Sequence, residues 1–175
     1  NRYVLLRLTS GGSAVHSDML AWNTADTVEN AAMQLLNAFF AVPQVSVRLA
    51  ELPPAHRNML DFYLHFIGRH ADTLYRSDFL PGPMEENIPW CAAESEGERI
   101  TVVYNAEIFT EAAMERTHYL INATGMEGLV AAPSAPCRAE IYTPEGTLCR
   151  TLDLPAGFVR LPVPCAGMAI LKRKA

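Results

Sequence analysis

The polar side chains best suited to binding a ligand lie close together near the start of the sequence. Residues 13–23 read SAVHSDMLAWN, and they include His16, Asp18 and Trp22. His16 and Asp18 can hydrogen-bond to hydroxyl groups, and the Trp22 ring can stack on the apolar face of a sugar. The same residue types also cap helices and stabilise turns, so a purely structural role is the alternative. We take these three residues as a candidate substrate-binding set.

The remaining titratable residues form no pattern with an obvious chemical use. Three histidines are nine and five residues apart, which is too irregular for one helix face: His56, His65 and His70. The four cysteines lack the C-x-x-C spacing of a zinc site. The sequence also contains no glycine-rich phosphate loop and no G-x-S-x-G nucleophile motif. We therefore expect neither a metal ion nor a cofactor.

Alternating strand-like and helix-like segments surround the candidate set. The run YVLLRL, residues 3–8, predicts a buried strand just before it, and the run QVSVRL, residues 44–49, predicts a second strand. Asp26 is expected to cap a helix between them, and Pro53-Pro54 is expected to open a second helix. Strand, helix, strand, helix is the order of a parallel sheet or barrel. In such folds substrates bind where the strands end at their carboxyl side.

The second half of the chain has a different pattern. Residues 80–83, Leu-Pro-Gly-Pro, are the best linker candidate. Short strand-like runs separated by turn signals follow as far as residue 172, which is typical of an antiparallel β-sandwich. We therefore predict two domains, residues 1–84 as the end of an α/β unit and residues 85–175 as a sandwich that folds on its own.

Composition limits the classes of protein that fit. Half of the 175 residues are hydrophobic and 19% are charged, which indicates a globular fold. The net charge of −5 argues against a nucleic-acid partner. No apolar run approaches the roughly 20 residues of a membrane helix, and no signal peptide is visible, so we expect no membrane partner. Reduced, mostly buried thiols are the expected state of the cysteines and fit a cytoplasmic location.

Two stretches resemble a known enzyme family. TSGGSAVHSDMLAWN, from residue 9, and VPQVSVRLAELPPAHRNMLDFYLHFIGRHADTLYRSDF, from residue 42, are similar to the end of the barrel in melibiase-type α-galactosidases. The resemblance implies the last βα units of a (β/α)8 (TIM) barrel followed by a C-terminal antiparallel β-sandwich. It covers most of residues 1 to about 80 closely and the remainder only in layout. The absence of an initiator methionine at Asn1 fits a piece of a longer chain.

The family resemblance implies a retaining hydrolysis of α-galactosides that uses two aspartates. It places YVLLRL on the seventh strand and QVSVRL on the eighth, with His16 at the position of a histidine that follows the seventh strand. Both catalytic aspartates then lie on earlier strands, so the isolated chain is expected to be inactive. In a rival alignment, Ser17-Asp18 matches the acid/base motif of the family and Asp18 is catalytic.

Two other functions fit the same residues. The chain could be a non-catalytic carbohydrate-binding or scaffold module, or an unrelated α/β enzyme whose site is the His16, Asp18 and Trp22 set. For an isolated piece of a barrel we further expect a homo-oligomer, because two strands cannot cover the apolar faces of two helices. Nine side chains form those faces: Val28, Leu35, Leu36, Phe39, Met59, Phe62, Tyr63, Phe66 and Ile67.

Overall fold

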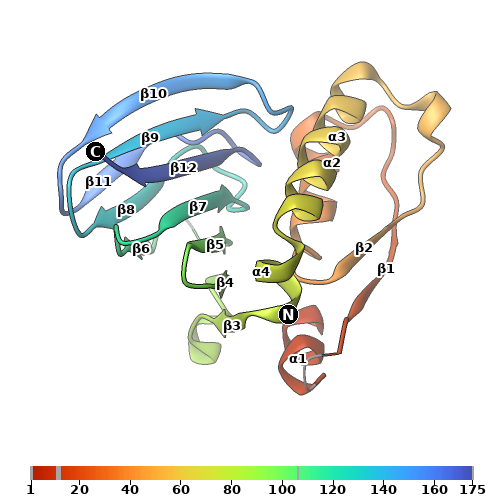
Figure 1. The fold of residues 1–175 in the computed structure, drawn as a ribbon. Coiled ribbons are helices and arrows are strands. Elements are labelled where there is room, and N and C mark those ends of the chain that lie inside the picture. Colours follow the sequence, from red (N-terminus) through yellow and green to blue (C-terminus); the bar gives the residue numbers. More distant parts are fainter. Residues whose placement is uncertain (1, 11–12, 106, 175) are drawn as a thin grey trace.

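The computed structural model describes residues 2–10, 13–105 and 107–174 of the chain. It is a mixed α/β structure in which most regular residues belong to sheets. Helices stand between a large sheet and a small parallel sheet, as Figure 1 shows, and a third sheet covers the other face of the large one. The described residues form no closed barrel.

The first part of the chain contains the parallel pair and all the α-helices. Its elements, in chain order, are α1 (Arg2–Thr9), β1 (His16–Leu20), α2 (Val28–Leu36), β2 (Val42–Val45), the 3-10 turn η1 (Leu49–Glu51), α3 (Pro54–Arg69) and α4 (Ala71–Arg76). β1 and β2 pair in parallel, with His16 opposite Val42 and Leu20 opposite Val45. The order β1, α2, β2, α3 is therefore two consecutive βα units.

The strand predicted for residues 3–8 is wrong, because these residues form helix α1. Val4 and Arg7, three residues apart, are buried, as on one face of a helix. The Arg7 guanidinium donates a hydrogen bond to the backbone oxygen of Tyr75 at 2.7 Å and lies 5.8 Å from the centre of the Phe79 ring. A short apolar run fits a helix as well as a strand, and here contacts with later elements select the helix.

The remaining boundaries in this part are closer to the expectation. The second predicted strand begins two residues earlier and ends at Val45. Thr27, not Asp26, caps α2, and its hydroxyl oxygen accepts a hydrogen bond from the backbone N–H of Asn30 at 3.3 Å. Helix α3 begins at Pro54 as predicted, because proline lacks the N–H that the first turn leaves unpaired.

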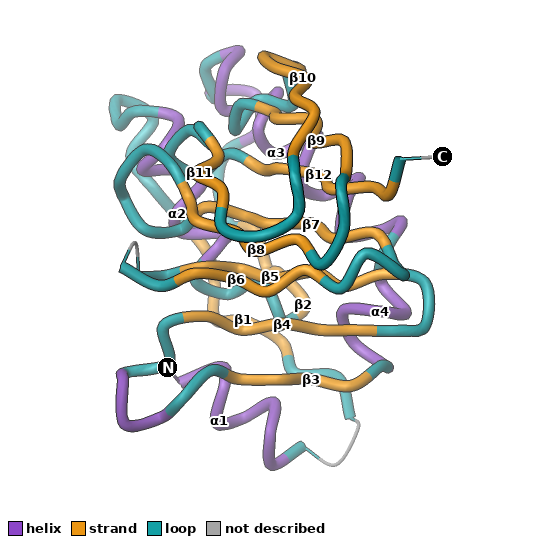
Figure 2. Tube along the Cα trace, turned by 90° about the vertical axis from the view of Figure 1, so that its left-hand side faces the viewer, coloured by secondary structure: helices purple, strands orange, loops and turns teal. Residues whose placement is uncertain are grey.

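The remaining strands form two facing sheets. Their bounds are β3 (Asp78–Pro81), β4 (Trp90–Glu94), β5 (Glu98–Val103), β6 (Phe109–Ala112), β7 (Thr117–Asn122), β8 (Leu129–Pro133), β9 (Cys137–Tyr142), β10 (Leu148–Leu154), β11 (Val159–Leu161) and β12 (Met168–Arg173), with a 3-10 turn η2 (Met84–Glu86). The large sheet has the order β10-β9-β12-β7-β5-β4-β3, which runs from top to bottom in Figure 2. The small sheet has the order β11-β8-β6.

The sequence predicted an antiparallel sandwich, but the sandwich in the structure is only partly antiparallel. β5 pairs in parallel with β7, and β6 pairs in parallel with β8. Parallel neighbours cannot be joined by a tight hairpin and need a crossover connection. Here the chain leaves the large sheet after β5, forms β6 in the small sheet and returns as β7.

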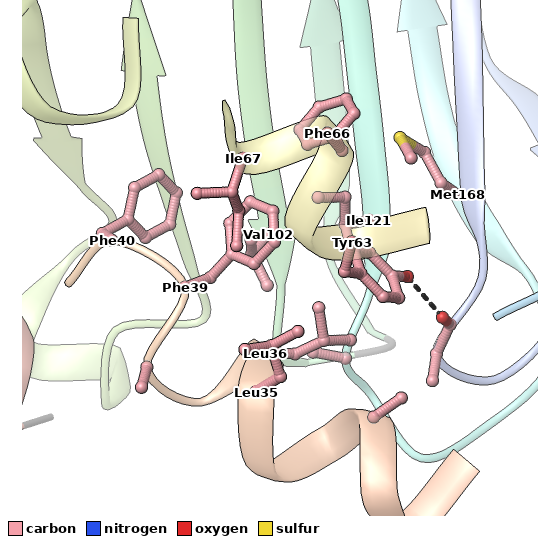
Figure 3. Packing of buried hydrophobic residues seen from close by; sticks show 14 of the residues in the cluster. Leu35, Leu36, Phe39, Phe40, Tyr63, Phe66, Ile67, Val102, Ile121 and Met168 are labelled. Atoms are coloured by element: carbon pink, nitrogen blue, oxygen red, sulfur yellow. Dashed lines mark hydrogen bonds between the residues drawn. The ribbon is translucent and has the colours of Figure 1, made fainter. Parts of the chain in front are cut away.

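The main core lies between the helices and the large sheet. Figure 3 shows Leu35, Leu36 and Phe39 packed near Tyr63, with Val102, Ile121 and Met168 of the large sheet in the same cluster. The Tyr63 hydroxyl donates a hydrogen bond to the backbone oxygen of Ala166 at 2.5 Å, and burial raises the Tyr63 pKa above its usual range. A second core of the sandwich lies between the large and small sheets.

This core contradicts the expectation that the apolar faces of α2 and α3 are exposed. Leu35, Leu36, Met59 and Tyr63 are fully buried, and Phe39 is only 1% exposed. The large sheet, rather than a second chain, covers the apolar faces of α2 and α3. Strand β3, which precedes the expected boundary at residue 84, pairs with β4 and so belongs to the large sheet.

Candidate functional site

His16 and Asp18 lie on strand β1, at an exposed part of the two-stranded sheet. Both side chains are exposed, whereas Ser17 between them is 4% exposed. The Ser17 hydroxyl donates a hydrogen bond to the backbone oxygen of Asp18 at 2.7 Å and accepts one from the Gln44 backbone N–H at 2.9 Å. Ser17 therefore joins β1 to β2 where the register of the pair shifts, and His16 and Asp18 are left facing outward.

Helix α1 fixes the position of Asp18. The Tyr3 hydroxyl accepts a hydrogen bond from the Asp18 backbone N–H at 2.9 Å. That N–H is therefore paired with a side chain of α1. The contact holds the N-terminal helix beside the strand that carries the candidate site.

Trp22 serves a structural role that the sequence did not reveal. Its indole N–H donates a hydrogen bond to Nδ1 of His56 at 3.1 Å, and Nε2 of His56 lies 3.0 Å from the backbone oxygen of Asp26. Since indole only donates, Nδ1 must accept, and Nε2 must carry the proton that is donated to Asp26. His56 is 2% exposed and ties the loop after β1 to helix α3.

The structure does not gather the three predicted residues around one point. His16 begins β1, whereas Trp22 follows its last residue, Leu20. A strand of five residues separates its first and last Cα atoms by about 13 Å. His16 and Asp18 therefore share the outward surface, and the half-buried Trp22 ring packs toward α3 and the main core.

The other residues considered from the sequence have ordinary surroundings. Cys91 and Cys137 are buried, but Cys149 is exposed, so only part of the expected burial of the thiols holds. Burial raises the pKa of the Cys91 thiol to about 12. Among the described residues, no three His, Cys, Asp or Glu side chains come together to hold a metal ion. Within the same ranges, no helix has both the length and the apolar character needed to cross a bilayer.

Sequence reasoning missed one side-chain pair. His70 and Glu98 are 28 residues apart, and Nδ1 of His70 lies 2.8 and 2.9 Å from the two carboxylate oxygens. Both side chains are mostly buried. No local spacing signals this pair, because the fold brings the end of α3 against the start of β5.

No protein-family model matches the chain, and no curated protein sequence matches it.

Proposed function

We propose that this chain is the C-terminal part of an α-galactosidase-like glycoside hydrolase. In this proposal β1 and β2 are the last two strands of a (β/α)8 barrel, and the large and small sheets form the sandwich that follows it. The substrate of the whole enzyme is an α-galactoside. The chain uses no cofactor, and the enzyme acts in the cytoplasm.

One observation carries the proposal. β1 and β2 form a parallel pair with a following helix each, and within the described residues neither strand has another strand on its outer edge. Unpaired strand edges present rows of unused N–H and C=O groups, and closure into a barrel removes them. The two strands and their helices have the order and pairing expected of adjoining units in such a barrel.

The strand assignment differs from the one that the sequence suggested. The seventh strand becomes β1, which contains His16, instead of residues 3–8. β2 remains the eighth strand. His16 and Asp18 then belong to one strand, with His16 at its amino end and Asp18 in its middle. Barrel substrates bind at the carboxyl ends of the strands, so this placement does not support His16 as a substrate-binding residue.

The chemistry itself is assigned to residues outside this chain. A retaining hydrolysis needs one carboxylate to attack the anomeric carbon and another to protonate the leaving oxygen. These groups come from different barrel strands. Asp18 is the one carboxylate on β1, and β2 contains none. This supports an inactive isolated chain over the rival role of Asp18 as acid/base.

The DNA upstream of the codon for Asn1 tests the proposal. We expect the reading frame to continue upstream and to encode further βα units, with aspartates at the carboxyl ends of two strands. A start codon immediately before Asn1 would contradict the proposal. It would favour a scaffold or binding module instead.

A further inference from the structure

A groove runs between helix α3 and the helix-facing side of the large sheet. Its volume is about 600 Å³, within the range of small-ligand sites. His65, Arg69 and His70 line the helix side, and Tyr119 of β7 and Ile170 of β12 line the sheet side. No residue of β1 or β2 takes part, so the groove does not depend on the function proposed for those strands.

The floor of the groove combines aromatic and aliphatic surface. Tyr119 lies opposite Ile170 in the register of β7 and β12, and Met168 lies opposite Tyr142 in the register of β12 and β9. The Tyr142 ring stacks on Phe62 of α3 with centroids 6.1 Å apart. These side chains offer an apolar surface of the kind on which the C–H face of a sugar ring can pack.

The turn between β9 and β10 approaches Phe62, one of the residues that line the groove. Gly146 in this turn has a φ of +80°, and a side chain there would come within 2.5 Å of the Phe62 ring. Glycine is therefore required both for the backbone conformation and for the close approach. From Phe62 to His70 the groove follows about 12 Å of helix, which gives it room for roughly two sugar rings.

The polar groups of the groove include both donors and acceptors. Glu98 bonds to Nδ1 of His70, which fixes the N–H on that atom and leaves Nε2 as an acceptor when the ring is neutral. No hydrogen bond or ion pair of the described residues engages the guanidinium of Arg69, which is exposed at the groove. The ammonium nitrogen Nζ of Lys172 lies 3.4 Å from Oε2 of Glu140 and adds further hydrogen-bond donors.

Charges of both signs at the groove oppose a strongly charged ligand. Arg69, Lys172 and Asp61 line it, and two carboxylates beside it pair with lining residues, Glu98 with His70 and Glu140 with Lys172. A polyanion would meet Asp61 and these neighbouring carboxylates, and a polycation would meet two fixed cations. A neutral ligand with many hydroxyl groups can use the donors and the acceptors together, because each hydroxyl both donates and accepts.

We propose that this groove binds a neutral saccharide of one or two rings. Arg69 donates to ring hydroxyls, Nε2 of His70 accepts from one, and Tyr119 and Ile170 support the apolar face of the sugar. The site lies where the sandwich meets α3, so it needs both parts of the chain.

Titration of the 15N-labelled 175-residue chain with melibiose and with cellobiose tests the proposal. We expect at least one of these neutral disaccharides to shift the amide signals of His70, Tyr119 and Ile170 in a saturable way. Arg69→Ala removes charged hydrogen bonds and should weaken binding about tenfold or more. Arg76→Ala is the matched control, since Arg76 is an exposed arginine in the last turn of α4 that pairs with Asp72.

Three outcomes of the sugar titrations would overturn the proposal. They are the absence of saturable shifts with both disaccharides, shifts that instead map to β1 and β2, and tighter binding of glucuronic acid or glucosamine than of either neutral sugar. Equal weakening by Arg69→Ala and Arg76→Ala would also contradict it. None of these results bears on the reading frame upstream of Asn1, so the two proposals fail separately.

Discussion

Asn122 begins an Asn-Ala-Thr sequence that matches a glycosylation signal, yet its side chain is completely buried. Its amide nitrogen donates to the backbone oxygens of Met126, Val163 and Pro164, at 2.8 to 3.1 Å. Its amide oxygen accepts hydrogen bonds from the backbone and hydroxyl of Thr124. The side chain joins the end of β7 to two loops and is not accessible for modification.

Replacing this amide by a carboxylate should be strongly destabilising. Asn122→Asp would bury a charge that faces three carbonyl oxygens, and we expect a loss of at least about 3 kcal/mol in the free energy of unfolding. Urea denaturation followed by circular dichroism measures it. Asn58→Asp, at an exposed position of α3, should change stability by less than about 0.5 kcal/mol. A similar small loss in both variants would show that the Asn122 network is not formed.

His118 should make stability depend on pH. Burial lowers its pKa below the ordinary 6.5, and the nearby cations of Arg99 and Arg116 act in the same direction, against the hydrogen bond to Ala113 and the charge of Glu94. The unfolded chain therefore takes up this proton at higher pH than the folded chain. The stability linked to His118 is fully present above about pH 6.5 and is lost as pH falls toward the folded pKa.

The variant His118→Gln isolates this contribution. Glutamine can still donate to the Ala113 oxygen, to which Nε2 of His118 is bonded at 2.8 Å. We expect the fall in unfolding free energy between about pH 7.5 and pH 5.5 to be smaller in this variant than in the natural chain. His65→Gln, at an exposed histidine, is the control. An unchanged pH profile in His118→Gln would contradict the assignment.

At the scale of elements, the sequence predicted most of the strands after residue 88. Alternating apolar residues and the turns at Gly97, Gly146 and Gly157 mark their limits, because these signals are local. β3 and β6 were missed, since each has only four residues, and β6 pairs with β8 rather than with the next strand along the chain. Helix α1 was taken for a strand because its partners, Tyr75 and Phe79, lie about 70 residues away.

The sequence placed His16 and Asp18 after a strand, whereas the structure places them on β1, which no local pattern indicated. Both side chains are exposed, and their role in binding stays a prediction. The hydrogen bond between Trp22 and His56, and the pairing of His70 with Glu98, depend on tertiary contacts with no local signature. Distant contacts of this kind decide whether a polar residue binds a ligand or supports the fold.

The sandwich half should be weakened when it is separated from the helices. Val102, Ile121 and Met168 are fully or almost fully buried, and they belong to the core that α2 and α3 complete. Exposing such side chains costs about 1.5–3 kcal/mol each. We therefore expect residues 85–175 alone to melt at lower temperature than the whole chain and to bind the dye ANS. Equal melting temperatures without dye binding would show that the sandwich needs no helical cover.

At the scale of the whole molecule, apolar surface remains exposed around α1 and β1. Leu5 is 53% exposed, Leu8 is 41% exposed and Met19 is 75% exposed. The hydrogen bond between Tyr3 and Asp18 holds this helix and strand together. In our proposal the preceding units of the barrel cover this surface and the outer edge of β1.

The exposed apolar surface around α1 and β1, rather than the helices α2 and α3, is now the reason to expect a homo-oligomer. Without a cover, the apolar side chains and the free strand edge should lead the isolated chain to associate with itself. The double variant Leu5→Lys and Met19→Lys should shift the population toward monomer, as measured by size-exclusion chromatography with light scattering. Met126→Lys, at an equally exposed loop position, should leave the distribution unchanged. A natural chain that is monomeric at micromolar concentration would rule the interface out.

Hydrolysis of 4-nitrophenyl α-galactoside tests whether this chain is part of an α-galactosidase. We expect turnover by the product of the whole reading frame, because the proposal places the catalytic aspartates on earlier strands of the barrel. We expect no turnover above buffer by residues 1–175 alone. Turnover by the 175-residue chain that disappears in Asp18→Asn would contradict the account and identify Asp18 as the acid/base. An inactive product of the whole reading frame would contradict the assignment as an α-galactosidase.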